Sequence, residues 1–368
     1  MEIRLDRSEF LTELAPMQGI VERKSTIPVL SHLKLTTRDG KLHLAATDLD
    51  VSLTSWCEAD VAADGGITVQ AKKFMEIIRS LRSDEVTLRL DEPKELTITA
   101  GHSRFKIHGQ APEDFPTLPE FNEEQSTEIP FQSFRRMVAK ILFAISADES
   151  RFQLNGALLK IEGSSVELVA TDGHRLAVVE SELEGTGIEG EAATVLVPRK
   201  ALQELQRFDG SGGLTFSRGP HHLCFRLGRR ELLCRILEGT FPDYERVIAS
   251  DNDKKIIFGT RHLLEAVGRV ALLTGDRARG VRMSFAPGAL TISAANPDLG
   301  EASEELACEY DGDTFQLGLN PDYLSQFLAA VETDEVRLEL KDESSQCVGY
   351  PVDGPDRRYL CVIMPMRL

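Results

Sequence analysis

The chain is poor in aromatic side chains and has no excess of positive charge. Among its 368 residues there are one Trp and five Tyr, so a surface of stacked aromatics for single-stranded nucleic acid is not expected. Lys and Arg number 42 against 59 Asp and Glu, which gives a formal net charge of −17 at pH 7. This balance excludes the simplest class of nucleic-acid binder, a small basic domain, and argues against an anionic membrane surface as a partner.

The sequence also lacks segments for membrane insertion, secretion and metal binding. No apolar run approaches the roughly 18 residues of a membrane-spanning helix, and the opening stretch MEIRLDRSEF is too polar for a signal peptide. The 6 Cys form no C-x-x-C pair and have no His at zinc-ligand spacing, and no Walker or dinucleotide-binding glycine motif is present. We therefore expect buried thiols in a reducing cytoplasm, no metal and no cofactor.

What the chain does contain is a threefold internal repeat. Each copy has an alternating apolar strand, a tight polar turn and a second strand, and the turns fall at Thr47, Thr171 and Asn296, 124 and 125 residues apart. A second marker keeps nearly the same spacing. It consists of Phe115-Pro116, Phe241-Pro242 and Met364-Pro365. The shared order of these markers predicts three similar domains.

Helical patterns follow the same rhythm. Each copy begins with apolar residues at steps of four, three and four, the spacing of an amphipathic helix. These residues are Phe10, Leu14, Met17 and Val21, then Phe134, Val138, Ile141 and Ile145, then Leu263, Val267 and Val270 with Thr274 in the fourth place. Pro16 is a misfit inside the first helix. A strand and a second helix follow in each copy, within 67–82, 194–209 and 315–331.

No copy shows the βαβ rhythm of a parallel sheet, so we predict an α+β fold. Each domain is expected to have antiparallel sheets with two helices on one face. The stretch 111–128 is acidic and Pro-rich and the stretch 242–255 is polar and charged, as is typical of connections between domains. The predicted domains are 1–120, 128–248 and 252–368.

Positive charge is concentrated in the predicted helices. Four windows, 70–82, 134–147, 198–208 and 259–283, together carry a net charge of +11 and leave −28 for the remainder. One interpretation is that helix surfaces are simply charged and solvated. The other is that the helices share a basic face that contacts the phosphates of a nucleic acid without reading its sequence.

The best enzyme-like string is the turn from Thr171 to Arg175, which brings together an acid, a His and an Arg. The chain has no G-x-S-x-G elbow, and the corresponding turns of the first and third copies lack the His. Asp172-Gly173 is better explained by turn chemistry, so no catalytic residue is expected. The unusual tail 362–368 contains two Met, a Pro and a Leu. It predicts a docked tail, an adaptable apolar pocket or a final edge strand.

The strings ATDGHRLAV, VPRK, GTFPDYERV, RGVR and the terminal MPMRL, with the TIPVL stretch at 26–30, resemble the bacterial DNA polymerase III β subunits, the replicative sliding clamps. The likeness covers the whole chain. It implies a head-to-tail homodimeric ring whose helices line the hole and whose sheets form the outside. Such a ring encircles duplex DNA of any sequence and makes or breaks no bond itself. It tethers the replicative polymerase, and it also binds the clamp loader, other polymerases and repair proteins through short linear motifs with Gln, Leu and Phe-like anchors.

The resemblance also implies three sets of site residues. A partner-peptide pocket between domains two and three is implied at Leu154, Thr171, Gly173, His174, Arg175, Leu176, Pro242, Arg246, Val247, Asn320, Tyr323, Val362, Met364, Pro365, Met366 and Arg367. DNA contacts are implied at Lys24, Phe152, Gln153, Arg199, Lys200, Arg277, Arg279 and Arg282. The dimer interface is implied at Lys73, Phe105 and Ile107 on one side and Leu272, Leu273, Glu301 and Glu304 on the other.

The sequence departs from the family pattern at two places and leaves two alternative functions. Phe152-Gln153 stands where some members have paired tyrosines, and Lys24 replaces a frequent Arg. Phe105 and Ile107 alternate in a strand, so they are alternatively core residues of the first domain. A scaffold that binds peptides without DNA, or a hydrolase centred on Asp172 and His174, are the alternative functions.

Overall fold

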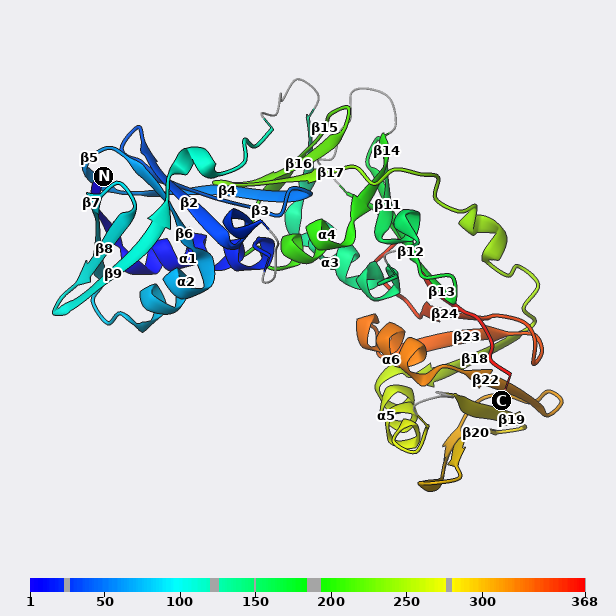
Figure 1. The fold of residues 1–368 in the computed structure, drawn as a ribbon. Coiled ribbons are helices and arrows are strands. Elements are labelled where there is room, and N and C mark those ends of the chain that lie inside the picture. The colour runs from blue at the N-terminus through cyan, green and yellow to red at the C-terminus, as the bar shows by residue number, and fades with distance from the viewer. Residues whose placement is uncertain (23–26, 120–125, 149, 184–192, 276–279, 368) are drawn as a thin grey trace. The chain divides into compact units, whose positions relative to one another are not determined.

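The computed structural model describes residues 1–22, 27–119, 126–148, 150–183, 193–275 and 280–367. The chain divides into two compact units, and each draws on the second repeat copy (Figure 1). Unit 1 is Met1–Gln132 with Lys200–Ile236, and unit 2 is Ser133–Arg199 with Leu237–Leu368. No helix among the described residues is long and apolar enough to cross a membrane.

The helices fall two to a repeat copy, as predicted. Among the described residues they are α1 (Arg7–Ile20), α2 (Ala71–Ser80), α3 (Phe131–Ile141), α4 (Arg199–Gln206), α5 (Thr260–Ala271) and α6 (Pro321–Ala330). Side chains cap several of them: the Asp6 carboxylate accepts from Glu9 N at the start of α1, and the Asn320 side chain accepts from Asp322 N at the start of α6.

Unit 1 contains one thirteen-stranded sheet, in the order β10-β15-β16-β17-β4-β3-β2-β6-β9-β8-β7-β1-β5. Its strands are β1 (Glu2–Asp6), β2 (His32–Arg38), β3 (Lys41–Thr47), β4 (Val51–Glu58), β5 (Asp60–Ala63), β6 (Gly66–Gln70), β7 (Glu85–Glu92), β8 (Glu95–Ala100), β9 (Ser103–Gln110), β10 (Ser126–Pro130), β15 (Gly213–Arg218), β16 (His222–Leu227) and β17 (Arg230–Arg235). The β17–β4 ladder joins a strand of the second copy to the first copy. Helix α1 packs against β3 and β4.

Unit 2 contains an eight-stranded sheet, β14-β11-β12-β13-β25-β24-β23-β18, and a four-stranded sheet, β21-β20-β19-β22. The first comprises β11 (Gly156–Glu162), β12 (Ser165–Thr171), β13 (Arg175–Glu182), β14 (Ala193–Pro198), β18 (Lys254–Gly259), β23 (Glu335–Leu340), β24 (Cys347–Pro351) and β25 (Arg358–Ile363). The second comprises β19 (Val281–Ala286), β20 (Ala289–Asn296), β21 (Gly300–Ala307) and β22 (Phe315–Leu319). Every ladder in the described residues is antiparallel, which confirms the predicted α+β class.

The proline inside α1 has a specific compensation. Pro16 has no N–H, so it leaves the carbonyl of Thr12 without its helical donor. Arg230 supplies one, because its Nη2 donates to Thr12 O at 3.1 Å. The same guanidinium forms a buried ion pair with Glu13, Nε to Oε2, at 2.9 Å. The sequence misfit at Pro16 is therefore resolved by a residue of the second copy.

In three helices the last residue differs from the one that the apolar spacing predicts. The first helix buries Ile20 in place of Val21, which is an extended cap. Ile145 is buried but lies beyond α3, after a short 3-10 turn. Thr274 lies beyond α5, and its hydroxyl donates to Ala271 O at the helix end. Apolar spacing located the helices but not their last turns, which backbone hydrogen bonds decide.

Candidate functional site

The turn between β12 and β13 is built by its own side chains. Thr171 Oγ1 donates to Arg175 O at 2.6 Å, and Asp172 Oδ1 accepts from the backbone N–H groups of His174 and Arg175 at 2.9 and 3.1 Å. Gly173 has a φ of +88°, which favours glycine. The Asp172 carboxylate accepts hydrogen bonds that form the turn, as its sequence context predicted.

The first copy repeats this turn bond for bond. Thr47 Oγ1 donates to Val51 O, and Asp48 Oδ1 accepts from the backbone N–H groups of Asp50 and Val51 at 2.9 and 2.6 Å. Leu49 occupies the position of the glycine with a φ of +81°. The fold therefore tolerates a large side chain at this strained position.

The C-terminal tail is docked in unit 2. Strand β25 lies between β13 and β24, so the prediction of a final edge strand is wrong. Beyond it, Met364 N donates to His174 O at 2.9 Å and Met366 N donates to Gly318 O at 2.8 Å. The tail reaches the turn because β25 pairs with β13, with Leu176 opposite Val362.

A cavity of about 140 Å³ opens where the turn, the tail and the connection after Phe241 meet. Its lining is Leu154, Thr171, Gly173, Arg175, Leu176, Pro242, Tyr244, Val247, Val362 and Met364. All but Tyr244 belong to the pocket that the family resemblance implies. The cavity borders a hydrophobic cluster on the eight-stranded sheet that includes Val169 and Leu360. Met364 remains 39% exposed, so its thioether is free to adapt to a ligand.

Tyr244 is the residue that sequence reasoning missed. It begins the 3-10 turn Tyr244–Val247, and only its place between Pro242 and Val247 could have suggested it. Its hydroxyl donates to Glu167 Oε1 at 2.6 Å and accepts from Lys160 Nζ at 2.6 Å. Burial, followed by the bond to Glu167, raises the pKa of Tyr244 to about 12.

Arg175 braces the pocket and is not available as a free cation. It is buried, and its Nε donates to Asp172 Oδ2 at 3.0 Å while Nη1 donates to Gln326 Oε1 at 2.6 Å. A third bond goes to the carbonyl of Phe143. Its guanidinium also lies 4.3 Å from the ring centre of Tyr323. These bonds fix the turn to α6.

Seven residues of the implied pocket lie outside this cavity. His174 is exposed, with its ring 6.5 Å from that of Tyr323. Arg246 pairs with Asp243 at 2.7 Å, and Asn320 caps α6. The other three line a second cavity in unit 2.

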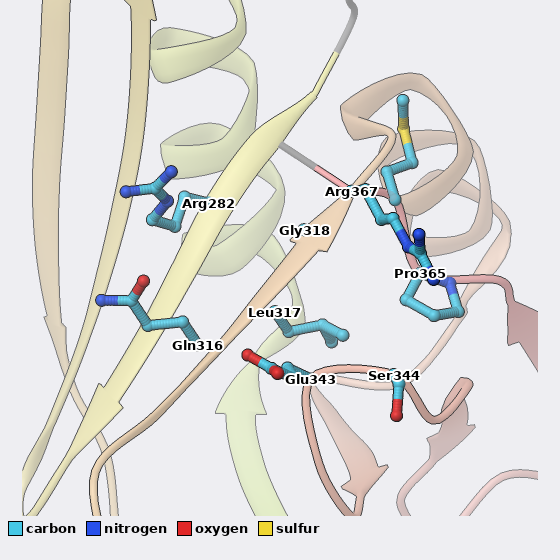
Figure 2. Close-up of a pocket in the computed structure, with 9 residues that line it drawn as sticks. Arg282, Gln316, Leu317, Gly318, Glu343, Ser344, Pro365 and Arg367 are labelled. Atoms are coloured by element: carbon cyan, nitrogen blue, oxygen red, sulfur yellow. The ribbon is translucent and has the colours of Figure 1, made fainter.

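This second cavity is larger and polar. It has a volume of about 630 Å³ and is lined by Arg282, Gln316, Leu317, Gly318, Glu343, Ser344, Pro365, Met366 and Arg367 (Figure 2). Figure 2 places Arg282 and Gln316 on one side and Pro365 and Arg367 on the other. Arg282 thus lies on a strand beside the tail rather than on a helix.

The basic helix windows are partly neutralised within the chain. Lys140 is buried and pairs with Asp356 at 2.5 Å and Glu332 at 2.8 Å, so it adds no surface charge. Lys200 Nζ contacts Asp48 at 2.5 Å and Ile20 O at 2.7 Å. Arg207, Arg261, Arg269 and Lys73 are also ion-paired. Within the described ranges, the window cations without an ion pair include Lys72, Arg79, Arg82, Arg136, Arg199 and Arg282.

The implied DNA contacts are only partly described. Lys24, Arg277 and Arg279 lie outside the described residues. Phe152 is 69% exposed in the 3-10 turn Phe152–Leu154, and Gln153 is half-buried. Arg199 N donates to Asn155 O at 2.9 Å, and the buried Arg199 Nε has no hydrogen-bond partner in the described structure. The turn therefore carries an exposed aromatic ring, and the backbone next to it, at Asn155, accepts from Arg199.

Two strand edges carry the implied dimer residues. Phe105 and Ile107 are half-buried on β9, which pairs with β8 along its length but with β6 only at Gly109 and Gln110. Neither side chain is among the buried core residues, so their alternative assignment to the core of the first domain is wrong. Strand β21 is the edge of its sheet and carries Glu301, exposed, and Glu304, paired with Arg269. Leu272 is 77% exposed, and Leu273 is half-buried.

Comparisons with known proteins match the whole chain. Three family models fit it in succession: DNA polymerase III beta subunit, N-terminal domain, at residues 1–119, central domain at 128–243 and C-terminal domain at 245–367. A protein of Pseudomonas aeruginosa named beta sliding clamp is 37% identical over 374 residues, and the match covers 100% of both chains.

Solved structures agree in fold along the full length. The Pseudomonas aeruginosa sliding clamp bound to griselimycin superposes with a TM-score of 0.92 at 35% identity. The sliding clamp of Bartonella birtlesii bound to griselimycin has a TM-score of 0.94 at 32% identity. Both matches cover 100% of this chain and of the solved one.

Proposed function

The chain belongs to the family of DNA polymerase III beta subunits, the beta sliding clamps, and from this premise we propose how its parts do the work. As a family member it is a sliding clamp of DNA replication, a processivity factor and not an enzyme. We propose that two copies close head to tail into a ring around duplex DNA in the cytoplasm. The ring holds the replicative polymerase, the clamp loader and repair proteins by short motifs.

The three-domain organisation follows the repeat. We propose domains at 1–120, 128–248 and 252–368, and the three matched family models support these bounds. The sheets cross both junctions between the proposed domains, because β17 pairs with β4 and β25 pairs with β13. Continuous backbone hydrogen bonding of this kind stiffens the join between repeat copies within each unit better than a flexible linker does.

Ring closure is supported by the two unpaired strand edges. Among the described residues, positions 103–108 of β9 and the outer side of β21 have no strand partner on one side, so they present backbone donors and acceptors. The β9 edge carries Arg104 and Lys106, which are paired with Asp91 and Glu95 inside the chain. Strand β21 carries Glu301 and Glu305, together with Glu304, which pairs with Arg269. Opposite charge on two different edges favours a head-to-tail contact between copies.

In this proposal the direct contacts between the protein and DNA are weak. The helix cations without an internal partner supply electrostatic contacts to phosphates that are independent of sequence. The exposed Phe152 adds an aromatic face that suits a sugar or a base. A closed ring retains DNA by topology, so these contacts need only be strong enough to guide sliding.

The apolar cavity is the proposed partner pocket, and its composition is the observation that carries this assignment. Its wall combines a fixed turn, braced by Arg175, with the adaptable Met364. A rigid floor and a flexible rim suit apolar anchors from many partner motifs. Holding the polymerase there raises its effective concentration at the primer end, which makes synthesis processive.

The test is removal of the tail from Met364 to Leu368. We expect the truncated protein to dimerise normally and to lose polymerase binding. Normal polymerase binding would show that the pocket lies elsewhere. A peptide-binding scaffold without DNA, the alternative function, would show no salt-sensitive retention on DNA. A hydrolase at Asp172 and His174 has no support, because both Asp172 oxygens are bound by turn amides and Arg175.

A further inference from the structure

In the second copy, Arg175 joins three elements of unit 2. Its Nε donates to Asp172 Oδ2 in the turn before β13, and its Nη1 donates to Gln326 Oε1 on α6. A third bond reaches the carbonyl of Phe143, in the short 3-10 turn after α3. One buried cation therefore connects the turn, the end of the first helix and the second helix of the next copy.

In the first copy, Lys200 makes the same three connections from the helix instead of the strand. It belongs to α4, and its Nζ contacts Asp48 Oδ2 at 2.5 Å and donates to Ile20 O, at the end of α1, at 2.7 Å. Val51 is buried at the strand position that Arg175 has in the second copy, 124 residues later. We call this contact between the turn after β3, the end of α1 and α4 the first junction.

Moving the cation to the helix leaves one acceptor of the first junction without a donor. Glu204 has the place on α4 that Gln326 has on α6, because each lies two residues after a buried leucine. Gln326 accepts from Arg175, whereas Glu204 has Oε1 paired with Arg207 at 2.7 Å and Oε2 buried without a hydrogen-bond partner in the described structure. A Cβ at Gly19 would clash with Glu204 Oε2, so the bare end of α1 makes room for this carboxylate.

Lys200 offsets the negative charge of the first junction. Burial raises the pKa of Glu204, the charges of Arg207 and then Lys200 act against that rise, and Asp48 adds to it. The carbonyl end of α1 disfavours a negative charge as well. The Asp48 side chain is only 10% exposed, so solvent screens its attraction to Lys200 incompletely. Without Lys200, two carboxylates would stand close to the negative end of a helix.

We propose that Lys200 is a positioning residue of the first junction, which fixes the turn after β3 and the end of α1 to α4 as Arg175 fixes their counterparts in the second copy. The family resemblance implied a DNA contact at Lys200, but its ammonium group is used inside the chain. A stiff junction holds the first copy, which carries the β9 edge, in place for ring closure. This last step rests on the proposed function.

Amide hydrogen exchange of the full chain measures the junction directly. We expect Lys200→Gln to speed exchange at 47–51 and at the end of α1 about tenfold, the effect of losing a coupled pair. Lys200→Arg keeps the charge and should retain most of the protection. The matched control is Arg235→Gln, which removes a mostly exposed cation 3.8 Å from Asp50 at the same turn and should leave exchange near the parent's. Equal exchange in the two Gln variants would overturn the proposal.

The dependence of stability on pH separates a charge contact from simple packing. Loss of Lys200 should raise the pKa of Glu204 further. In urea unfolding, the penalty of Lys200→Gln should therefore be small below pH 4.5, the ordinary value for Glu, and should grow as pH rises through the folded pKa. Adding Glu204→Gln should reduce this growth. A penalty that is the same at every pH would mean lost packing alone and would overturn the charge contact.

The link to the ring is tested separately by analytical ultracentrifugation, where Lys200→Gln should weaken the dimer and Arg235→Gln should not. A dimer as stable as the parent's, with exchange changed as expected, would leave the junction standing and remove its role in ring closure. A parent chain that stays monomeric would contradict the proposed ring and not the junction. If Lys200→Gln keeps the parent's exchange but lowers the slope of log DNA affinity against log salt by about 0.9, Lys200 is a DNA contact and the proposal is wrong.

Discussion

The backbone N–H of Met364 donates to the carbonyl of His174 at 2.9 Å, and this bond joins the end of the chain to a turn of the second repeat. The first copy makes the same bond, because Arg235 N donates to Asp50 O at 2.9 Å. The scaffold is therefore common to both copies. What distinguishes the second is a glycine at the turn and a methionine at the tail, and both line the apolar cavity.

Replacing Gly173 by Leu should block partner binding and leave the fold intact. Leu49 shows that this turn accepts a leucine with φ above zero, so we expect a stability loss of only about 1 kcal/mol. A Cβ at Gly173 would lie 3.0 Å from Arg151 Nη1 at the wall of the apolar cavity, so we expect the leucine to crowd the cavity and to lower affinity for an anchor peptide at least tenfold. Fluorescence anisotropy and thermal unfolding measure the two effects. Unchanged affinity would remove Gly173 from the site.

Replacing Arg230 by Met should strongly destabilise the protein. The change leaves Glu13 as a buried unpaired carboxylate and removes the donor to Thr12 O, at a cost of about 3–5 kcal/mol. Urea unfolding of the full chain measures the loss. The matched control is the double variant Glu13→Leu with Arg230→Met, which should recover much of the stability. A single variant as stable as the parent contradicts the compensation of Pro16.

Stability should respond to pH through Glu204. Burial, the largest effect, raises the pKa of this carboxyl above its ordinary value of 4.5, and its Oε2 is buried without a hydrogen-bond partner in the described structure. Because the folded pKa is the higher one, the contribution of Glu204 is fully present below pH 4.5 and is lost as pH rises through the folded pKa. Glu204→Gln should flatten this dependence and raise stability at neutral pH, as denaturant unfolding across pH would show. A variant with the parent's pH profile would rule Glu204 out as its source.

Ring closure should depend on the exposed Leu272. An Asp there costs the isolated chain little, since the side chain is 77% exposed, but it places a charge in the proposed contact. We expect Leu272→Asp to give folded monomers in analytical ultracentrifugation. Leu49→Asp, at a side chain 51% exposed in unit 1, is the control and should remain dimeric. Two variants with the same dimer dissociation would remove Leu272 from the interface.

Cations without internal partners should carry the contact with DNA. Removing one phosphate contact lowers the slope of log affinity against log salt by about 0.9. We therefore expect Arg136→Gln to reduce this slope for direct binding to linear DNA. Arg261→Gln should change it less, because Arg261 is paired with Glu265 at 2.7 Å. Equal effects would mean that ion pairing inside the chain does not govern DNA contact.

Local sequence patterns predicted the elements well, because helices and turns follow from neighbouring residues. The amphipathic spacing located each helix, and Thr171-Asp172 predicted a turn whose bonds the side chains supply themselves. The ion-pair partner of each charged side chain could not be predicted from neighbouring residues. Lys140 lies in a basic window yet is buried against Asp356, 216 residues away. Such pairings depend on which strands meet, which composition does not encode.

The residues of the candidate site were predicted in outline, but their division between two cavities depends on which strands meet and was not predicted. Nine residues implied by the family resemblance line one cavity, but the tail separates it from a second that holds Pro365 to Arg367. Tyr244 was missed because its contribution depends on how the connection folds over the sheet. The half-buried state of Phe105 depends on β9 losing its partner β6 after two residues, a register that no alternation of apolar residues reveals.

The most direct test of the central claim is retention on DNA with and without ends. The protein is loaded by a clamp loader onto a nicked circular plasmid, and bound protein is measured before and after the plasmid is linearised. The account predicts stable retention on the circle and release on linearisation, because a ring held by topology slides off free ends. Equal retention on both forms would show direct DNA affinity and contradict the clamp mechanism.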